Sequence, residues 1–228
     1  MLSPQRIADP RAAALAERRA GMMERIYAAA LEQFSSHGLH GTSTREIARS
    51  AGISKQQLHY YIESKEALYE SILRRTMQHW AHIGLNTEED LSEPAASLAR
   101  LVERKLDFAF EHPRVSRLFA GEILRGGHVM RSLWQSGQAS VDAAAEVIRG
   151  WVEAGKIAPV DPMYLMFHIW ALTQHYADYE AQVRFFTRSA DAAPLDRAAI
   201  REEVTALVLR GVGIDDRAPR KPARARRR

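Results

Sequence analysis

The segment GTSTREIARSAGISKQQLHYYIESKEAL, residues 41–68, fits few folds. Ser43 and Glu46 are spaced as in a capping box, which predicts that a helix begins directly after Ser43. Gly52 lies where the chain must turn sharply, because glycine tolerates the left-handed backbone that such a turn often requires. Ser54 can cap a second helix. The spacing therefore predicts two short helices that cross at a steep angle.

The apolar residues of this segment give the two predicted helices a common buried side. Ile47 and Ala48 form the inner face of the first helix, and the small Ala48 lets the second helix approach closely. Ile53 fills the space under the turn, while Leu58 and Tyr61 lie on the inner side of the second helix. A tight helical hairpin inside a core is the alternative interpretation.

The outward residues of the second helix favour a helix-turn-helix that reads DNA. In this motif the second helix lies in the major groove, with its first residues nearest the base edges. Glutamine can pair with adenine and lysine can donate to guanine, while hydroxyls and a lysine at a helix start suit phosphates. The predicted DNA-binding residues are Ser43, Thr44, Arg45, Ser54, Lys55, Gln56, Gln57, His59, Tyr60, Tyr61 and Lys65.

The rest of the chain is also predicted to be helical. Ala, Leu, Glu and Arg are abundant, and no stretch shows the sustained alternation of a strand. We expect an all-α fold of about nine helices, the first from about Ala20 and a long one from Pro162 to about residue 186. The expected divisions are a flexible N-terminal arm (1–19), a three-helix DNA-binding domain (20–84), a ligand-binding and dimerisation domain (85–213) and a disordered basic tail (214–228).

Charge is divided unevenly along the 228 residues. The net charge is +3 over residues 1–84, −6 over residues 85–216 and +7 over residues 217–228, so only part of the chain is expected to face a polyanion. The absence of cysteine excludes disulfides and thiolate metal sites. No segment reaches the roughly 18 apolar residues of a membrane helix, and the N-terminus lacks an apolar signal core. We therefore expect a cytoplasmic protein without a membrane partner.

Residues 20–84 as a whole resemble the DNA-binding domain of the TetR family of repressors. The shared features are the lead helix, the turn GLHGT, the string IARSAGIS and the string SKEAL. His59 and Ile62 depart from the aromatic residue and phenylalanine that are common in the family. The resemblance implies an all-α homodimer that binds a palindromic operator and is released by a small molecule. It also implies that the last two helices, about 163–186 and 196–210, form the dimer.

The second half resembles the C-terminal domain of uracil-responsive repressors of pyrimidine utilisation, through HPRVSRLFAGEILRGG, GWVEAGKIAPVDP and IWALTQHYADYEAQV. The resemblance implies an effector like uracil or thymine. Trp170, Gln174 and Asp178 are spaced by four, so they share a helix face where an indole and an amide could meet a flat ring. The resemblance adds Trp80, Phe119 and Ile123, whose helices pack around the ligand pocket in the family. The predicted ligand-binding residues are therefore Trp80, Phe119, Ile123, Trp170, Gln174 and Asp178.

Several side chains of the predicted helix from Pro162 could have a role other than ligand binding. Trp170 and Phe167 could instead be core or dimer-interface residues. His168, His175 and Tyr179 lie towards another face of the same helix and are better candidates for the dimer seam.

Histidine pairs raise the question of a metal. His79 and His82 are three residues apart, and His175 could join Asp178. Zinc would need further ligands at a characteristic spacing, and none is evident. We therefore expect neither a metal nor a cofactor.

Glu122 also has two interpretations. Its apolar neighbours would suit a buried carboxylate, whereas Arg125 nearby would suit an exposed, solvated pair. The sequence slightly favours the exposed residue.

Two other functions fit parts of the sequence. The basic tail would suit a ligand-independent protein that compacts DNA without sequence preference. An enzyme is disfavoured, because the sequence has no nucleophile with a partnered base, no glycine-rich phosphate loop and no metal signature. The sequence favours a ligand-responsive DNA-binding regulator that is not an enzyme.

Overall fold

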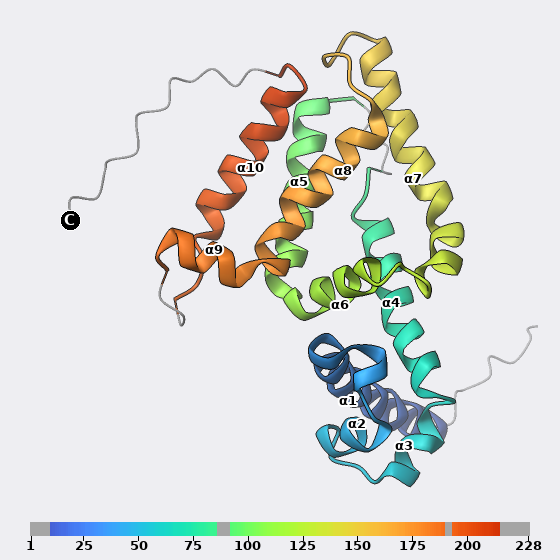
Figure 1. Cartoon of the computed structure of the whole chain (residues 1–228). Helices are drawn as coiled ribbons and strands as arrows, with labels where there is room; N and C mark the ends of the chain where they lie inside the picture. The colour runs from blue at the N-terminus through green and yellow to red at the C-terminus, as the bar shows by residue number, and fades with distance from the viewer. Residues whose placement is uncertain (1–9, 86–91, 190–192, 215–228) are drawn as a thin grey trace, which may run out of the picture. The chain divides into compact units, whose positions relative to one another are not determined.

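The computed structural model describes residues 10–85, 92–189 and 193–214. Within these ranges every element of secondary structure is an α-helix, as predicted (Figure 1). No helix of the described residues is both long and apolar enough to cross a membrane. The helices are α1 (Pro10–Gly41), α2 (Thr44–Ser50), α3 (Lys55–Tyr61), α4 (Lys65–His82), α5 (Pro94–Glu111), α6 (Pro113–Leu124), α7 (Met130–Glu153), α8 (Pro162–Asp178), α9 (Glu180–Thr187) and α10 (Arg197–Gly211).

The described residues form ten helices instead of about nine because the long helix predicted from Pro162 is divided. At Tyr179 the backbone leaves helical geometry (φ −112°, ψ 30°), which separates α8 from α9. The predicted start of α8 is confirmed. The Asp161 carboxylate accepts hydrogen bonds from the backbone N–H groups of Met163 and Tyr164 at 2.8 and 3.1 Å, and Pro162 occupies the first turn.

The first helix begins about ten residues earlier than the sequence predicts. Residues 10–19, assigned to a flexible arm, are helical. The segment PRAAALAERRA is rich in alanine, which has the highest helix propensity, so it can be helical without a packing partner. The remainder of the predicted arm and the basic tail from residue 215 lie outside the described residues.

The chain divides into two compact units. Unit 1 joins residues 10–80 with residues 112–137, so α6 and the first turns of α7 belong with the helices that precede them. The predicted division after residue 84 would instead assign these turns to the C-terminal domain. The core of unit 1 includes the fully or nearly fully buried residues Ile26, Phe34, Ile47, Leu58, Tyr69, Leu118, Met130 and Leu133.

Unit 2 is built around α5. Both α8 and α10 pack against this helix, as Figure 1 shows. Its core includes Leu98, Val102, Leu106, Ile148, Ile169, Val204 and Val208, each at most 5% exposed. Complete burial of one such side chain contributes roughly 1.5–3 kcal/mol, so the three helices are held by apolar contact. Phe167 of α8 and Leu207 of α10 are large apolar residues that stay exposed.

Candidate functional site

The two short helices α2 and α3 begin with matching capping boxes. The Ser43 hydroxyl accepts a hydrogen bond from the Glu46 N–H at 3.2 Å, and the Glu46 carboxylate accepts from the Ser43 N–H at 2.9 Å. The Ser54 hydroxyl and the Gln57 side chain repeat the exchange at 3.1 and 2.9 Å. Each box satisfies two N–H groups. Both predicted caps are confirmed, and the bonds from Ser43 lower the pKa of Glu46.

The turn between these helices depends on Gly52. Its φ of 66° lies in the left-handed region, as the sequence predicts. A Cβ atom there would lie 3.1 Å from the Arg25 guanidinium, which donates to the Ala51 carbonyl at 2.6 Å. Behind the turn, Ile47 and Leu58 are fully buried. The crossing of α2 and α3 is therefore held by the Arg25 hydrogen bond at the turn and by the buried Ile47 and Leu58 behind it.

Substitution of Gly52 by alanine should lower the free energy of unfolding by about 1–2 kcal/mol, because alanine is strained at this φ. Urea unfolding measures the loss. Gly150→Ala is the matched control: Gly150 lies within α7 with no atom near its missing Cβ, so alanine should stabilise by about 0.5–1 kcal/mol. Equal stability of Gly52→Ala and wild type would contradict this account of the turn.

The predicted reading residues lie on the outer side of this scaffold. Lys55, Gln56, His59 and Tyr60 of α3 are exposed, and Tyr61 is half-buried beside Tyr60. Ser43, Thr44 and Arg45 stand at the start of α2, with Arg45 exposed. These side chains can offer donors, acceptors and positive charge to a partner.

Besides the capping residues Ser43 and Ser54, two more predicted DNA-binding side chains form hydrogen bonds within the protein. Gln57 is exposed, but its side-chain oxygen accepts the Ser54 N–H in the capping box. Lys65 is only 20% exposed at its side chain, and its ammonium group donates to the Thr42 carbonyl at 2.9 Å. Lys65 thereby joins the start of α4 to the turn before α2, so its phosphate role remains a prediction.

The six predicted ligand-binding residues divide equally between the units. In unit 1 the rings of Trp80 and Phe119 contact edge to face, with centres 4.5 Å apart, and Ile123 is 36% exposed. In unit 2 the other three lie half-buried on α8: Trp170, Gln174 and Asp178.

Lys105 is a candidate ligand-binding residue that the sequence does not predict. Its ammonium nitrogen, on α5, lies 5.8 Å from the centre of the Trp170 ring. Burial lowers the pKa of Lys105 to about 8. Nothing in the string ERKLD marks this position, because lysine on a helix is ordinarily exposed. Within unit 2, an aromatic plane and a partly buried cation thus lie together.

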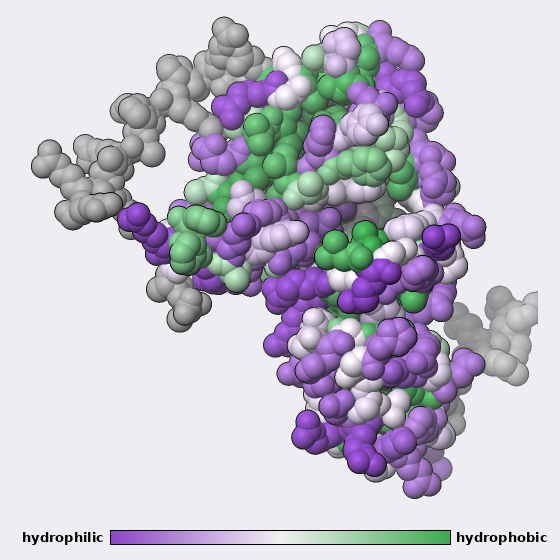
Figure 2. Space-filling model, viewed as in Figure 1, coloured by the Kyte–Doolittle hydropathy of each residue, from purple (hydrophilic) through white to green (hydrophobic). Residues whose placement is uncertain are grey.

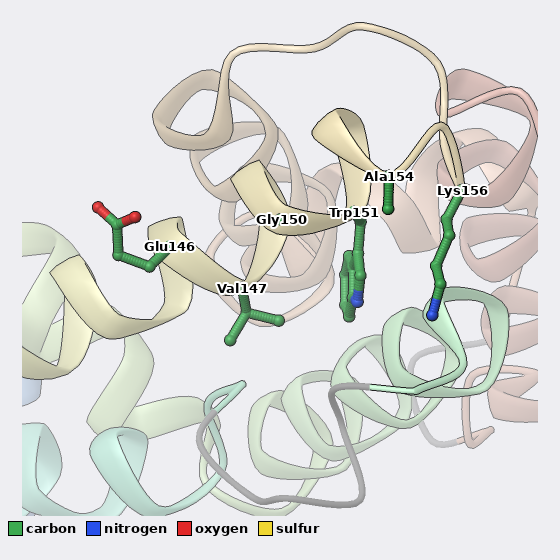
Figure 3. A pocket seen from close by; sticks show the side chains of 6 residues that line it. All are labelled: Glu146, Val147, Gly150, Trp151, Ala154 and Lys156. Carbon is green, nitrogen blue, oxygen red and sulfur yellow. The ribbon is translucent and has the colours of Figure 1, made fainter.

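A groove of about 430 Å³ lies along the C-terminal half of α7 (Figure 3). Val147 and Trp151 point to the same side of the helix there, as the figure shows. None of the predicted ligand-binding residues lines this groove. Its lining residues are Glu146, Val147, Gly150, Trp151, Ala154 and Lys156.

Glu122 is buried at 6% exposure, so the interpretation that the sequence favoured is wrong. Its carboxylate accepts hydrogen bonds from the Tyr69 hydroxyl and the Val129 N–H, both at 3.0 Å. Arg125 donates to the Tyr69 oxygen at 3.3 Å. Packing of α6 within unit 1 covers this side of the helix, and the bonds compensate the carboxylate for lost water. Burial raises the pKa of Tyr69 to about 12.

The described part of the chain contains no group of three or more His, Asp or Glu residues that could hold a metal ion. His175, one of the residues considered for a metal, stacks on Tyr179 with ring centres 5.0 Å apart. The His175 imidazole therefore has an aromatic neighbour, Tyr179.

Two family descriptions match the chain. Residues 26–72 match "Bacterial regulatory proteins, tetR family", and residues 73–215 match "YcdC-like protein, C-terminal region". The first match contains α2, α3 and the turn between them. The second contains most of α4 and all the later helices.

Two curated relatives are transcription factors. RutR of Escherichia coli strain K12, an HTH-type transcriptional regulator, is 43% identical over 163 residues, which cover 71% of this chain and 76% of RutR. NicS of Pseudomonas putida strain KT2440, an HTH-type transcriptional repressor, is 30% identical over 134 residues, covering 58% of this chain and 62% of NicS.

A solved structure shares the fold. It is the crystal structure of AibR in complex with isovaleryl coenzyme A and operator DNA, with a TM-score of 0.60 and 20% sequence identity. The match covers 80% of this chain and 97% of AibR.

Proposed function

The chain belongs to the TetR family of bacterial regulatory proteins, and from this premise we propose a repressor that binds a palindromic operator as a dimer and is released by a small effector. Like its relatives, it is a DNA-binding transcriptional regulator and not an enzyme. One observation carries the proposal: α3 is anchored by the buried Leu58 and capped by Ser54, while the opposite side of the helix is polar and exposed.

Base reading is assigned to Lys55, Gln56 and His59. Lys55 and Gln56 occupy the first turn of α3, the part of a reading helix nearest the base edges. The Gln56 amide can donate to and accept from adenine at once, and Lys55 can donate to guanine. Gln57 keeps the helix start in place. Arg45 and Tyr60 are assigned to phosphates, which position the helix without reading sequence.

Selection of binding sites from a pool of random duplexes tests the proposal. A dimer should enrich a sequence with twofold symmetry whose half-sites are about one helical turn, or a multiple of it, apart. Failure to enrich any symmetric sequence would favour the alternative of a ligand-independent protein that compacts DNA.

Dimerisation through the last long helices is supported by the exposed face of unit 2. A stripe along α8 and its C-cap consists of Tyr164, Phe167, His168, His175 and Tyr179, all exposed. Leu207 of α10 is 50% exposed. Figure 2 shows hydrophobic residues on the face that carries α8 and α10. Exposed apolar surface of this kind suits a partner protein, and a second copy can present the same surface in return.

The double variant Phe167→Asp with Leu207→Asp should be monomeric in analytical ultracentrifugation. Charge placed at two apolar positions opposes burial of both copies of the seam. Operator affinity should fall by about 100-fold or more, because a monomer engages only one half-site. Leu124→Asp, at an 83% exposed position on α6, is the control and should leave the dimer intact. A dimeric double variant would contradict the proposed seam.

The effector is proposed to be a flat pyrimidine such as uracil or thymine. The resemblance of residues 100–186 to uracil-responsive repressors supports this class. So does the chemistry of unit 2: Trp170 can stack on a flat ring, Gln174 can pair with a ring amide, and Lys105 can donate to a carbonyl oxygen. The polar groups on such a ring match these partners.

Uracil or thymine at a hundredfold excess over its Kd should raise the Tm by about 5–10 °C. Adenine should give a smaller shift. Trp170→Ala and Gln174→Ala should each abolish most of the pyrimidine shift, and Gln182→Ala, at an exposed position of α9, should preserve it. Absence of a shift in the wild type would exclude these pyrimidines, and a full shift in Gln174→Ala would move the binding site elsewhere.

A further inference from the structure

The first turns of α1 contribute little to the core of unit 1. Arg11 and residues 13–20 are all exposed, and even Leu15 is 68% exposed. A helical segment with no buried stripe is not shaped by packing inside its own chain. Its charged residues are Arg11, Glu17, Arg18 and Arg19, so the segment is positive overall. This combination suits an anionic partner.

The same segment lies beside the end of the reading helix. The Arg19 guanidinium carbon is 5.6 Å from the centre of the Tyr60 ring and 5.8 Å from that of Tyr61. The two rings are nearly perpendicular, at 87°. Tyr60 is 71% exposed, so this cluster is part of the open surface of α3. The basic segment is therefore continuous with the surface assigned to DNA.

Arg19 is held in a way that leaves its chemistry usable. A cation beside an aromatic ring is held by its charge, so the contacts of Arg19 with the two rings use none of its five N–H donors. Those donors match two oxygens of a phosphate. Arg25, farther along α1, differs because it donates to the Ala51 carbonyl and supports the turn. Arg25 of α1 thus stabilises the turn, whereas Arg19 of the same helix contacts the tyrosine pair.

We propose that Arg18 and Arg19 bind the sugar–phosphate backbone of the duplex whose bases α3 reads. The proposal rests on the proposed function, because it needs α3 to lie on DNA. The tyrosine pair then does more than present hydroxyl groups: its rings orient Arg19 towards the backbone. Because phosphates are alike in every sequence, these contacts raise affinity without selecting a base.

The test is Arg18→Ala with Arg19→Ala in the full-length chain, on the selected palindrome and on a random duplex at matched salt. Alanine preserves the helix. Affinity should fall by about tenfold on both duplexes, the ratio between them should stay constant, and the slope of log affinity against log salt should decrease by at least about 1. Arg19→Lys should recover part of the loss.

The charge-matched control is Arg114→Ala with Arg149→Ala, at exposed positions on α6 and α7, which should retain wild-type affinity. Unchanged affinity and salt slope in the Arg18/Arg19 variant would overturn the inference, and so would an equal loss in the control. A separate variant distinguishes failure of this inference from failure of the proposed function. If α3 did not read DNA, the Lys55/Gln56 variant described in the Discussion would bind both duplexes like wild type.

Discussion

Lys55→Ala combined with Gln56→Ala should lower affinity for the selected palindrome by at least about 100-fold at fixed salt, because each base contact contributes about 1–3 kcal/mol and a dimer loses it twice. Affinity for a random duplex should fall by only a few fold, since phosphate contacts dominate nonspecific binding. Fluorescence anisotropy titrations with both duplexes measure the two constants. The variant should therefore lose sequence preference more than it loses DNA binding.

The choice of Gln56 over Gln57 follows from the capping box. Gln57→Ala would remove the acceptor for the Ser54 N–H and destabilise α3 by about 1 kcal/mol, so lost affinity could reflect a frayed helix. Lys156→Ala with Gln182→Ala replaces the same residue types at exposed positions of unit 2 and is the control. Wild-type preference in the Lys55/Gln56 variant would show that α3 is not the reading helix.

Glu122→Ala should lower the free energy of unfolding by about 3 kcal/mol, because a buried hydroxyl and a backbone N–H lose their acceptor together. Tyr69→Phe should cost about 2 kcal/mol, since the carboxylate keeps the Val129 N–H but loses the hydroxyl. In a double-mutant cycle measured by urea unfolding, the coupling between these changes should be about 1–2 kcal/mol. Additive effects within about 0.5 kcal/mol would contradict a direct bond between the side chains.

The same network has a signature at alkaline pH. The folded-state pKa of Tyr69, about 12, lies above the ordinary tyrosine value near 10. The associated stabilisation is therefore complete below about pH 10 and is lost as pH rises towards 12. In the ultraviolet titration of tyrosine, the component near pH 12 should be absent from Tyr69→Phe. Persistence of that component in the variant would assign it to another tyrosine.

Local signals in the sequence were sufficient for the reading head. The caps at Ser43 and Ser54, the turn at Gly52 and the buried Ile47 and Leu58 all depend on residues within one or two turns of each other. Capping and turn chemistry act over that distance, so the pattern could be recognised without knowledge of the fold.

The features that the sequence did not predict depend on segments far apart in the chain. Glu122 is buried because α6 packs within unit 1, and its main partner, Tyr69, is 53 residues away. Lys105 is partly buried because α8 covers α5. The early start of α1 had another cause, since two prolines near the N-terminus suggested an arm while the alanines favoured a helix.

The ratio of affinity for the selected palindrome to affinity for a random duplex, at one salt concentration, tests the central claim most directly. A repressor that reads sequence through α3 should give a ratio of at least about 1,000. A ratio near one would contradict the account and indicate a protein that binds DNA through charge alone.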